Sequence, residues 1–562
     1  MIKKKTGLYK QTQFMKKSLL KSVLIGFILF LFPLSADATT YYFYVQLKDK
    51  HNSPYTLANP SFYLSTRAIA RRAYYSIPVD STDLPVNPAY ISQIANLGIH
   101  VHCKTKWLNG VTLLMADTTI MSQVRALPFV KFVQYTGLTN DNLTAGSPQK
   151  ISNQTNFNYG VAATQINQMN GSVLHNNSFR GENIYISVID DGFQNVNLNP
   201  AFDSLRMENR LLGTKDFVNP ASDIYDQDSH GAKVLSCMAA NIPGKYLGTA
   251  PKASYLLIRT ENAIGEYLCE ADFWTSGIEY ADSTGVDVST SSLGYTTFND
   301  SKMNFTYSDL NGKTARASIA ADMAVKKGIV LLNSAGNEGD KTFKYISVPS
   351  DAEGVITVGS VSSTGVVSGF SSFGPTSDGR VKPELCAMGS SSTLVAYSDS
   401  IIVIQGSGTS YSCPILAGLT ACYLQAAKAK MPSHTLSILK NNLIESGSLY
   451  SSPTNQMGYG IPDFSKAYNA INKTNIENTY NNINVKISIN SQEKILKIGI
   501  LDNNVNLSDA NLIIYSVSGQ VSLKEPLRSR YSDIDIASLG KGIYVLTIQN
   551  NGTKFREKIL IL

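Results

Sequence analysis

Cysteine is scarce in this chain, with six residues among 562. No two of them stand three positions apart, so the Cys-x-x-Cys arrangement of zinc and redox sites is missing. So few cysteines also exclude a disulfide-rich scaffold. We expect buried, inert thiols, and one disulfide stays open because the sequence does not assign its partners. The six are Cys103, Cys237, Cys269, Cys386, Cys413 and Cys422.

The chain also lacks an excess of one charge once its first residues are set aside. Its formal charge is +7, and residues 1–38 hold seven lysines and one aspartate, a net +6. Of the chain's 49 basic and 42 acidic residues, the remainder keeps 42 and 41. This balance gives no electrostatic basis for binding nucleic acid or an anionic membrane.

Long apolar runs are missing, with one exception near the start. Lys16, Lys17 and Lys21 precede an apolar run over residues 23–34, and Ala36 to Ala38 offer a small-x-small cleavage site. We interpret residues 1–38 as a secretory signal peptide, because the run is short for a membrane span. The alternative is an uncleaved membrane anchor.

Composition and periodicity divide residues 39–562 into four parts. Residues 39–140 predict a small α+β unit, with strands at 41–47, 111–115 and 130–134 and helices at 65–73 and 90–97. Residues 155–468 alternate short apolar runs with helical patterns, which indicates βαβ units and a parallel sheet. Asparagine-rich residues 469–484 predict a linker. Residues 485–562 switch to period two, which favours an all-β sandwich.

Two residues of the α/β region stand where a sheet positions catalytic groups. Asp190 ends the apolar run 185–189, and a carboxylate there can orient a histidine ring. His230 follows Asp228 and Ser229, either of which can cap the helix predicted over 232–240. Taken alone, Asp190 fits an ordinary Asp-Gly turn and His230 a surface histidine.

Two further residues complete a nucleophilic set. Asn337 follows a predicted strand at 329–332, and its amide can donate to a developing oxyanion. Ser410 precedes a helix predicted from Ile415, with Pro414 tolerated in the first turn. A serine at a helix N-terminus gains from the free backbone N–H groups nearby. Alone, Asn337 fits a Gly-Asn turn and Ser410 an N-cap.

Together, in this order, the segments resemble the subtilisin-like serine peptidases (subtilases, peptidase family S8). The resemblance covers roughly residues 159–470, and it rests on Val188-Ile189-Asp190-Asp191-Gly192, Ser229-His230-Gly231, Ala335-Gly336-Asn337-Glu338-Gly339 and Gly408-Thr409-Ser410 with Pro414. It implies a parallel sheet flanked by helices and a secreted serine-type endopeptidase that acts through an acyl-enzyme.

The resemblance also assigns roles. Ser410 is then the nucleophile, His230 the general base, Asp190 its orienting partner and Asn337 an oxyanion donor. The resemblance implies that Ser292, Leu293 and Gly294 pair with the backbone of a polypeptide substrate. It also implies that Ser334, Ala335 and Gly336 line the pocket for the residue before the cut.

The chain departs from the family pattern at Ala232, Lys233 and Tyr411. We expect Lys233 to point away from the catalytic residues and these changes to affect specificity more than mechanism. The family chemistry requires no cofactor. The usual calcium loop lacks its pattern at residues 240–245. Asp223, Asp226 and Asp228 could bind calcium, but we favour a solvated acidic loop there.

The flanking units have resemblances of their own. Residues 63–72 resemble the propeptides of one bacterial branch of the family, which implies that the chain's own propeptide inhibits it. Residues 512–519 and 534–544 resemble the sorting domain of the type IX secretion system. That implies that this secretion machinery is a partner, with export through the periplasm to the medium or the cell surface. Independent binding modules are the alternative for both units.

Other enzyme classes fit the sequence less well. An α/β-hydrolase places its aspartate after the serine and uses a Gly-x-Ser-x-Gly turn, which Ser410 lacks. A chymotrypsin-like enzyme is all-β with histidine first. The remaining alternative is a non-catalytic surface binding protein built on an inactive subtilase, a pseudoprotease.

Overall fold

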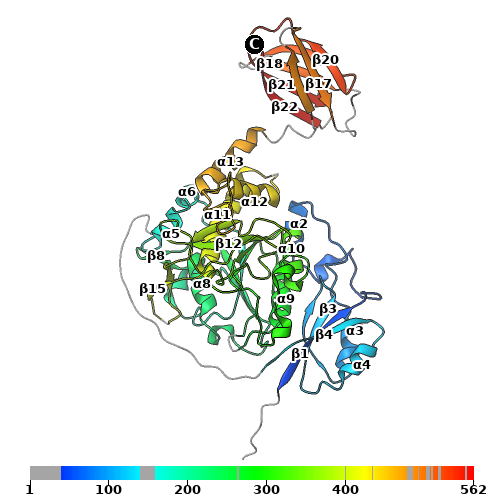
Figure 1. Cartoon of the computed structure of the whole chain (residues 1–562), viewed down its shortest axis with the longest axis vertical. Helices are drawn as coiled ribbons and strands as arrows, with labels where there is room; N and C mark the ends of the chain where they lie inside the picture. The colour runs from blue at the N-terminus through cyan, green and yellow to red at the C-terminus, as the bar shows by residue number, and fades with distance from the viewer. Residues whose placement is uncertain are drawn as a thin grey trace, which may run out of the picture.

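The computed structural model describes residues 39–139, 159–262, 265–398, 400–432, 434–477, 485–490, 493–501, 507, 510–516, 520–550 and 553–561. The predicted signal peptide lies outside them. Figure 1 shows a large central unit with a smaller α+β unit against it and a separate all-β unit near the C-terminus. Among the described residues, no helix has both the length and the apolar character that crossing a membrane requires.

The first unit is an antiparallel sheet with three helices. The strand order is β2-β3-β1-β4, with β1 (Thr40–Leu47), β2 (His100–Thr105), β3 (Gly110–Met115) and β4 (Val130–Thr139). The helices are α2 (Thr66–Tyr74), α3 (Pro88–Ala95) and α4 (Met121–Ala126). The sequence predicted every one of these elements except β2 and α4. Strand β2 was missed because its alternation is weak: histidines occupy two of its six positions.

The central unit is built on a seven-stranded sheet of order β13-β12-β11-β10-β5-β9-β6, and its pairs are parallel. Its strands are β5 (Tyr185–Asp190), β6 (Leu211–Asp216), β9 (Ser254–Arg259), β10 (Val288–Ser291), β11 (Val330–Ser334), β12 (Ile356–Val361) and β13 (Leu385–Met388). Most are buried along their length, which explains their continuous apolar runs.

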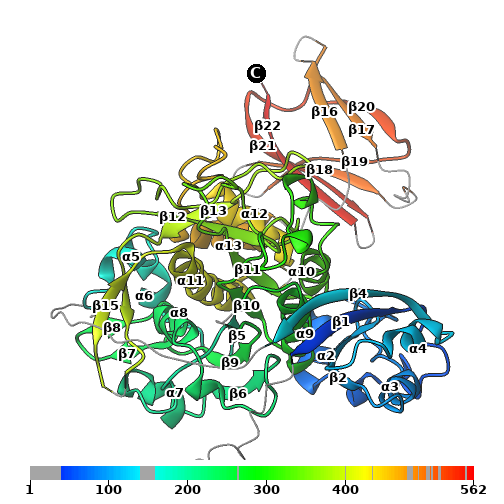
Figure 2. The ribbon, with the colours of Figure 1, turned by 60° about the horizontal axis from the view of Figure 1, so that its bottom comes forward.

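Helices cover both faces of this sheet, as Figure 2 shows. Helices α8 (His230–Ala239) and α11 (Thr409–Lys430) pack on one face, and α9 (Cys269–Thr284) and α10 (Arg316–Lys326) pack on the other. Two large apolar cores result, one on each face. The remaining helices are α5 (Ala163–Asn167), α6 (Ser172–Asn176), α7 (Asp203–Met207), α12 (Leu436–Glu445) and α13 (Phe464–Glu477). Helix α13 occupies residues 469–477 of the predicted linker, so the linker prediction was wrong there.

Two short hairpins complete the central unit: β7 (Asn241–Ile242) with β8 (Tyr246–Leu247), and β14 (Ser392–Val395) with β15 (Val403–Gly406). The parallel sheet with helices on both faces confirms the predicted α/β class.

The last unit contains two antiparallel sheets, β16-β17-β20 and β19-β18-β21-β22, which share one apolar core. Its strands are β16 (Val485–Asn490), β17 (Ile495–Ile500), β18 (Asn511–Ser516), β19 (Val521–Pro526), β20 (Tyr531–Asp535), β21 (Gly542–Asn550) and β22 (Thr553–Ile561). This arrangement confirms the predicted all-β sandwich.

Candidate active site

Asp190 and His230 meet at the carboxyl end of the parallel sheet. Asp190 is the last residue of β5 and is fully buried, and His230 opens α8. His230 Nδ1 lies 2.7 Å from Asp190 Oδ1. A hydrogen bond of this kind fixes the tautomer of the neutral imidazole, the form in which Nε2 can accept a proton.

Local sequence explains how the two elements come so close. A Cβ at Gly231 would lie 2.3 Å from the carbonyl oxygen of Gly192 and 2.8 Å from Asp190 Cβ, so only glycine fits there. Asp228 Oδ1 accepts from the backbone N–H of His230 at 3.0 Å and thereby caps α8. Of the two predicted caps, Asp228 makes the side-chain bond and Ser229 does not.

The pKa of His230 is raised to about 9. Burial lowers it, but the charge and hydrogen bond of Asp190 outweigh that effect, Asp191 adds to the rise, and Lys233 opposes it. The His230 side chain is 26% exposed, and its ring lies 5.9 Å from that of Tyr411. Lys233 Nζ lies over the Tyr397 ring at 5.8 Å, and its charge still reaches the imidazole.

Ser410 occupies the first turn of α11, which begins earlier than the sequence predicted. Pro414 therefore lies inside the helix rather than in its first turn, and it has no N–H to donate to the Ser410 carbonyl. Ser292 Oγ donates to that carbonyl instead, at 2.8 Å. The helix thus tolerates a proline because a side chain from the neighbouring strand end satisfies the freed oxygen.

The Ser410 hydroxyl points to the same neighbour. Its Oγ donates to the carbonyl oxygen of Ser292 at 3.4 Å, a long bond, and no hydrogen bond joins it to His230 among the described residues. The structure therefore pairs Asp190 with His230 directly and brings Ser410 to the same edge of the sheet, with its hydroxyl turned toward Ser292.

Asn337 is oriented by the residue that precedes Ser410. Its Oδ1 accepts from Thr409 N at 2.9 Å and from Thr409 Oγ1 at 3.1 Å. With the oxygen engaged, the NH₂ group faces the other way, and Nδ2 lies 3.8 Å from where a Gly408 Cβ would stand. The amide is thus held as a donor next to the start of α11, where the first N–H groups have no helical partner.

The predicted substrate-binding residues form two segments that flank α11. Ser292, Leu293 and Gly294 follow the end of β10, whereas Ser334 ends β11 and leads into Ala335 and Gly336. Asn333 Nδ2 donates to the Leu293 carbonyl at 2.9 Å, which joins the segments. The Gly336 N–H donates to Thr409 Oγ1 at 3.2 Å, which joins the second segment to the helix.

Sequence reasoning missed Thr409 and Ser347. Thr409 lies inside a motif that the sequence did single out, so its position was available as a signal. Ser347 Oγ lies 1.9 Å from where a Gly294 Cβ would stand and 3.3 Å from the equivalent point at Gly336. No local pattern marks Ser347, because its contacts are to segments distant in the chain.

Among the described residues, two groups of acidic or histidine side chains have ligand atoms close enough together to hold a metal ion. One is Asp190 and Asp191 with His230, and the other is Glu261, Glu266 and Glu270, whose ligand atoms lie within 4.8 Å of one another. Burial raises the pKa of all three glutamates, to about 7 for Glu266. The three aspartates considered for calcium, Asp223, Asp226 and Asp228, form no such group, and Asp223 and Asp228 cap local turns.

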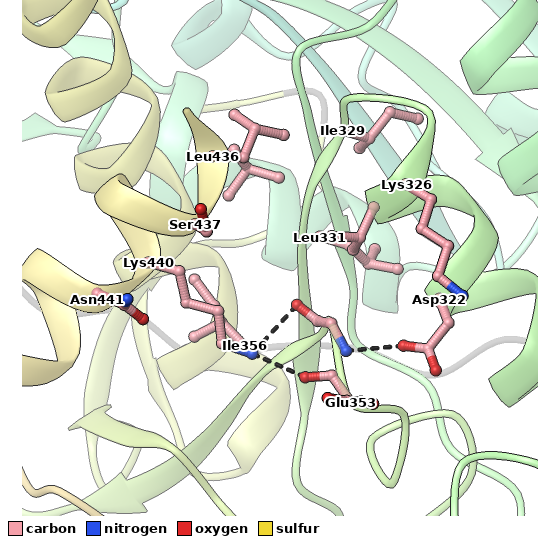
Figure 3. Close-up of a pocket in the computed structure, with 13 residues that line it drawn as sticks. Asp322, Lys326, Ile329, Leu331, Glu353, Ile356, Leu436, Ser437, Lys440 and Asn441 are labelled. Carbon is pink, nitrogen blue, oxygen red and sulfur yellow. Dashed lines mark hydrogen bonds between the residues drawn. The ribbon is translucent and has the colours of Figure 1, made fainter. Parts of the chain in front are cut away.

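A cavity of about 410 Å³ lies between α10, α12 and strands β11 and β12 (Figure 3). Ile329, Leu331 and Leu436 give it an apolar wall, and Lys440 lies at its edge. The Lys440 ammonium is already engaged by the Glu353 carbonyl at 2.8 Å. None of the lining residues belongs to the candidate active site.

Comparison with known proteins separates the same three units. Residues 181–460 match the model of the subtilase family, residues 42–155 match the peptidase S8 propeptide domain of Bacteroidota, and residues 470–562 match a secretion system C-terminal sorting domain. The second and third matches support a propeptide domain and export through a secretion system.

Individual relatives agree. Subtilisin DY of Bacillus licheniformis is 30% identical over 268 residues, which cover 47% of this chain and 84% of the relative. Subtilisin E of Bacillus subtilis (strain 168) is 29% identical over 373 residues, which cover 66% of this chain and 83% of the relative. Serine protease AprX of the same strain is 27% identical over 308 residues, and the chain spans 65% of its length. The chain belongs to the subtilase family of serine peptidases.

Proposed function

We propose that this peptidase is a secreted endopeptidase that cuts polypeptides through a covalent acyl-enzyme on Ser410. The observation that carries the proposal is the 2.7 Å bond between Asp190 and His230, at the sheet edge where α11 presents Ser410. A buried aspartate, a partly exposed histidine and a serine at a helix N-terminus are the three roles that this chemistry needs.

The first step forms the acyl-enzyme. Rotation about χ1 turns the Ser410 hydroxyl from Ser292 toward His230, and Nε2 takes its proton while Oγ bonds to the scissile carbonyl carbon. The carbonyl electrons move to oxygen, where Asn337 Nδ2 and the Ser410 N–H donate to the new charge. His230 then gives its proton to the amine nitrogen, the C–N bond breaks, and the amine leaves.

The second step regenerates the enzyme. A water gives a proton to His230 as its oxygen attacks the ester carbon, and the tetrahedral oxyanion again lies against Asn337. The intermediate collapses, the acid leaves, and the proton returns to Ser410 Oγ. Throughout, the Asp190 side chain accepts from Nδ1–H, which orients the ring and stabilises the imidazolium.

Substrate binding uses the segments beside α11. Residues 292–294 continue from β10 beyond its last paired residue, so an extended polypeptide can add there as a further strand. Residues 334–336 then form a wall of the pocket for the side chain before the cut. The unit at 39–139 is the intramolecular inhibitor, and the C-terminal sandwich engages the type IX secretion machinery for release or surface attachment.

Cleavage of unfolded casein by the processed protein tests the proposal, beside Ser410→Ala and with a phosphonyl fluoride reagent. The expected result is cleavage by the wild type alone, with mass spectrometry locating the reagent on Ser410. If the propeptide-free wild type matches Ser410→Ala, the chain is a pseudoprotease and the proposal is wrong.

A further inference from the structure

Helix α2 stands apart from the rest of the propeptide unit. Figure 1 shows it at the opposite end of that unit from α3 and α4, and it packs against α9 of the peptidase. Its side chains contact the C-terminal end of α9. The helix has the sequence TRAIARRAY, which places Arg67 and Arg71 on one face and Arg72 beside them.

The N-terminal end of α2 meets the C-terminal end of α9. Helix α9 stops at Gly285, whose left-handed backbone (φ 93°) suits glycine, and a Cβ there would lie 2.7 Å from Ala68 N. Ser65, the N-cap of α2, donates its N–H to the Ser283 carbonyl at 2.9 Å and its hydroxyl to the Thr284 carbonyl at 2.8 Å. The propeptide thus satisfies carbonyl groups that a helix end leaves unpaired.

The arginines then enter acidic positions beside that helix end. Arg71 pairs with Asp282 at 2.5 Å, Arg72 pairs with Asp282 at 2.9 Å, and Arg67 pairs with Asp287 at 2.5 Å. The negative end of the α9 dipole favours cations at the same place.

The charges also alternate between the two units. Asp83 of the propeptide accepts from Arg72 at 2.6 Å and from Lys327 of the peptidase at 2.9 Å. Lys106 of the propeptide reaches Asp282 at 3.2 Å. Each unit therefore supplies both signs, which restricts the partners that fit.

Because these ion pairs are buried, removing one partner of a pair is costly. The side chains of Arg71, Arg72, Asp83 and Asp282 are 2% exposed or less. Burial alone raises the pKa of Asp282, yet Lys106, Arg71 and Arg72 together hold it below its usual value. Removing one side of such a pair leaves a buried charge without a partner, which is far costlier than losing a surface ion pair.

We propose that α2 is a second anchor of the propeptide, separate from the substrate cleft, and that it keeps the propeptide on the peptidase after the connecting segment is cut. The surface made by Asp282, Asp287, Lys327 and the carbonyl end of α9 is its receptor. It fits a helix that presents adjacent arginines with an aspartate nearby. This deepens the proposed role of the propeptide, and it requires no catalysis by Ser410.

The test uses the full chain carrying Ser410→Ala, with the recognition sequence of a site-specific protease placed within residues 140–158. After cutting, gel filtration over a dilution series measures the dissociation constant of the two parts. The parent should stay associated at micromolar concentration, and Arg71→Ala with Arg72→Ala should raise the dissociation constant by about 100-fold or more. Arg125→Ala, on the exposed end of α4, is the matched control and should leave it unchanged.

Circular dichroism before cutting checks that each chain is folded. If the double variant fails to fold, Arg67→Ala replaces it, because Arg67 is 33% exposed and lies at the edge of the anchor; about a tenfold rise is then expected. The proposal is overturned if the arginine variants stay associated as tightly as the parent, or if the parent separates at once on cutting. Since every chain here lacks the nucleophile, neither result depends on whether Ser410 is catalytic.

Discussion

Asp190 Oδ1 and His230 Nδ1 lie 2.7 Å apart, and each end of that bond comes from a different element, the end of β5 and the start of α8. The aspartate is fully buried, whereas the histidine is partly exposed. The carboxylate therefore holds the ring from inside the protein and leaves Nε2 toward solvent and substrate. Gly231 and the Asp228 cap keep α8 at this distance.

Replacing Asp190 by asparagine should lower kcat by about four orders of magnitude while leaving KM within a few-fold, because the amide holds the wrong imidazole tautomer. Steady-state kinetics on a chromogenic peptide measure the effect. Asp191→Asn is the control: burial and the Asp190 charge raise the pKa of Asp191, so its neutral analogue should cost far less. Equal losses in the two variants would contradict the assigned roles.

The raised pKa of His230 predicts how stability depends on pH. Its folded value, about 9, exceeds the ordinary 6.5, so its contribution is fully present below about pH 6.5 and is lost as pH rises through about 9. In the Ser410→Ala chain, the thermal midpoint should fall over that window. Adding Asp190→Asn should flatten the fall, and an identical slope with and without Asp190 would contradict the prediction.

Asn337→Ala should lower kcat by about 10²- to 10³-fold with little change in KM, because the donor acts on charge that exists only in the transition state. Thr409→Val should give a smaller loss, since it removes the hydroxyl that orients the amide but keeps the backbone N–H that also binds it. Measuring kcat and KM for both variants separates the loss of the donor group from the loss of its orientation. A larger loss in Thr409→Val would reverse that order.

Much of this arrangement could be predicted from the sequence because it depends on local pattern. Apolar runs that end in a polar residue place that residue at the sheet edge, which brought Asp190 and Asn337 to the correct strands. The two helices that carry His230 and Ser410 were also expected, but their starts were placed too late, at residue 232 instead of His230 and at Ile415 instead of Thr409. The order of these residues then pointed to one family.

What could not be predicted depends on contacts between distant segments. Ser292 and Ser410 are 118 positions apart, and nothing near either residue shows that one hydroxyl satisfies the carbonyl that Pro414 leaves free. Ser65 and Thr284, joined across 219 positions, are a second example. Satisfying buried polar groups is a property of the folded chain, so a window of sequence does not contain it.

The six cysteines are free and buried in the structure, and burial raises the pKa of each thiol. A buried, protonated thiol is a poor nucleophile. Ellman's reagent should therefore find no reactive thiol in the native protein and six after unfolding in guanidinium without reductant. Fewer than six in the unfolded protein would reveal a disulfide that the structure lacks.

Gly294→Ala tests the packing of the two segments beside α11. The added Cβ would lie 1.9 Å from Ser347 Oγ, far inside contact distance, and Ser347 is 2% exposed with little room to move. The strand end must then shift, and a displacement of this size at a substrate-positioning segment can cost about 100-fold in kcat/KM.

Ser347→Gly in the same chain removes the obstructing hydroxyl and should restore most of the activity. Ser368→Gly, which removes a buried hydroxyl that bonds Ser360 instead, should restore none. If Gly294→Ala remains fully active, or if both second changes restore activity equally, then Ser347 does not set the spacing of these segments.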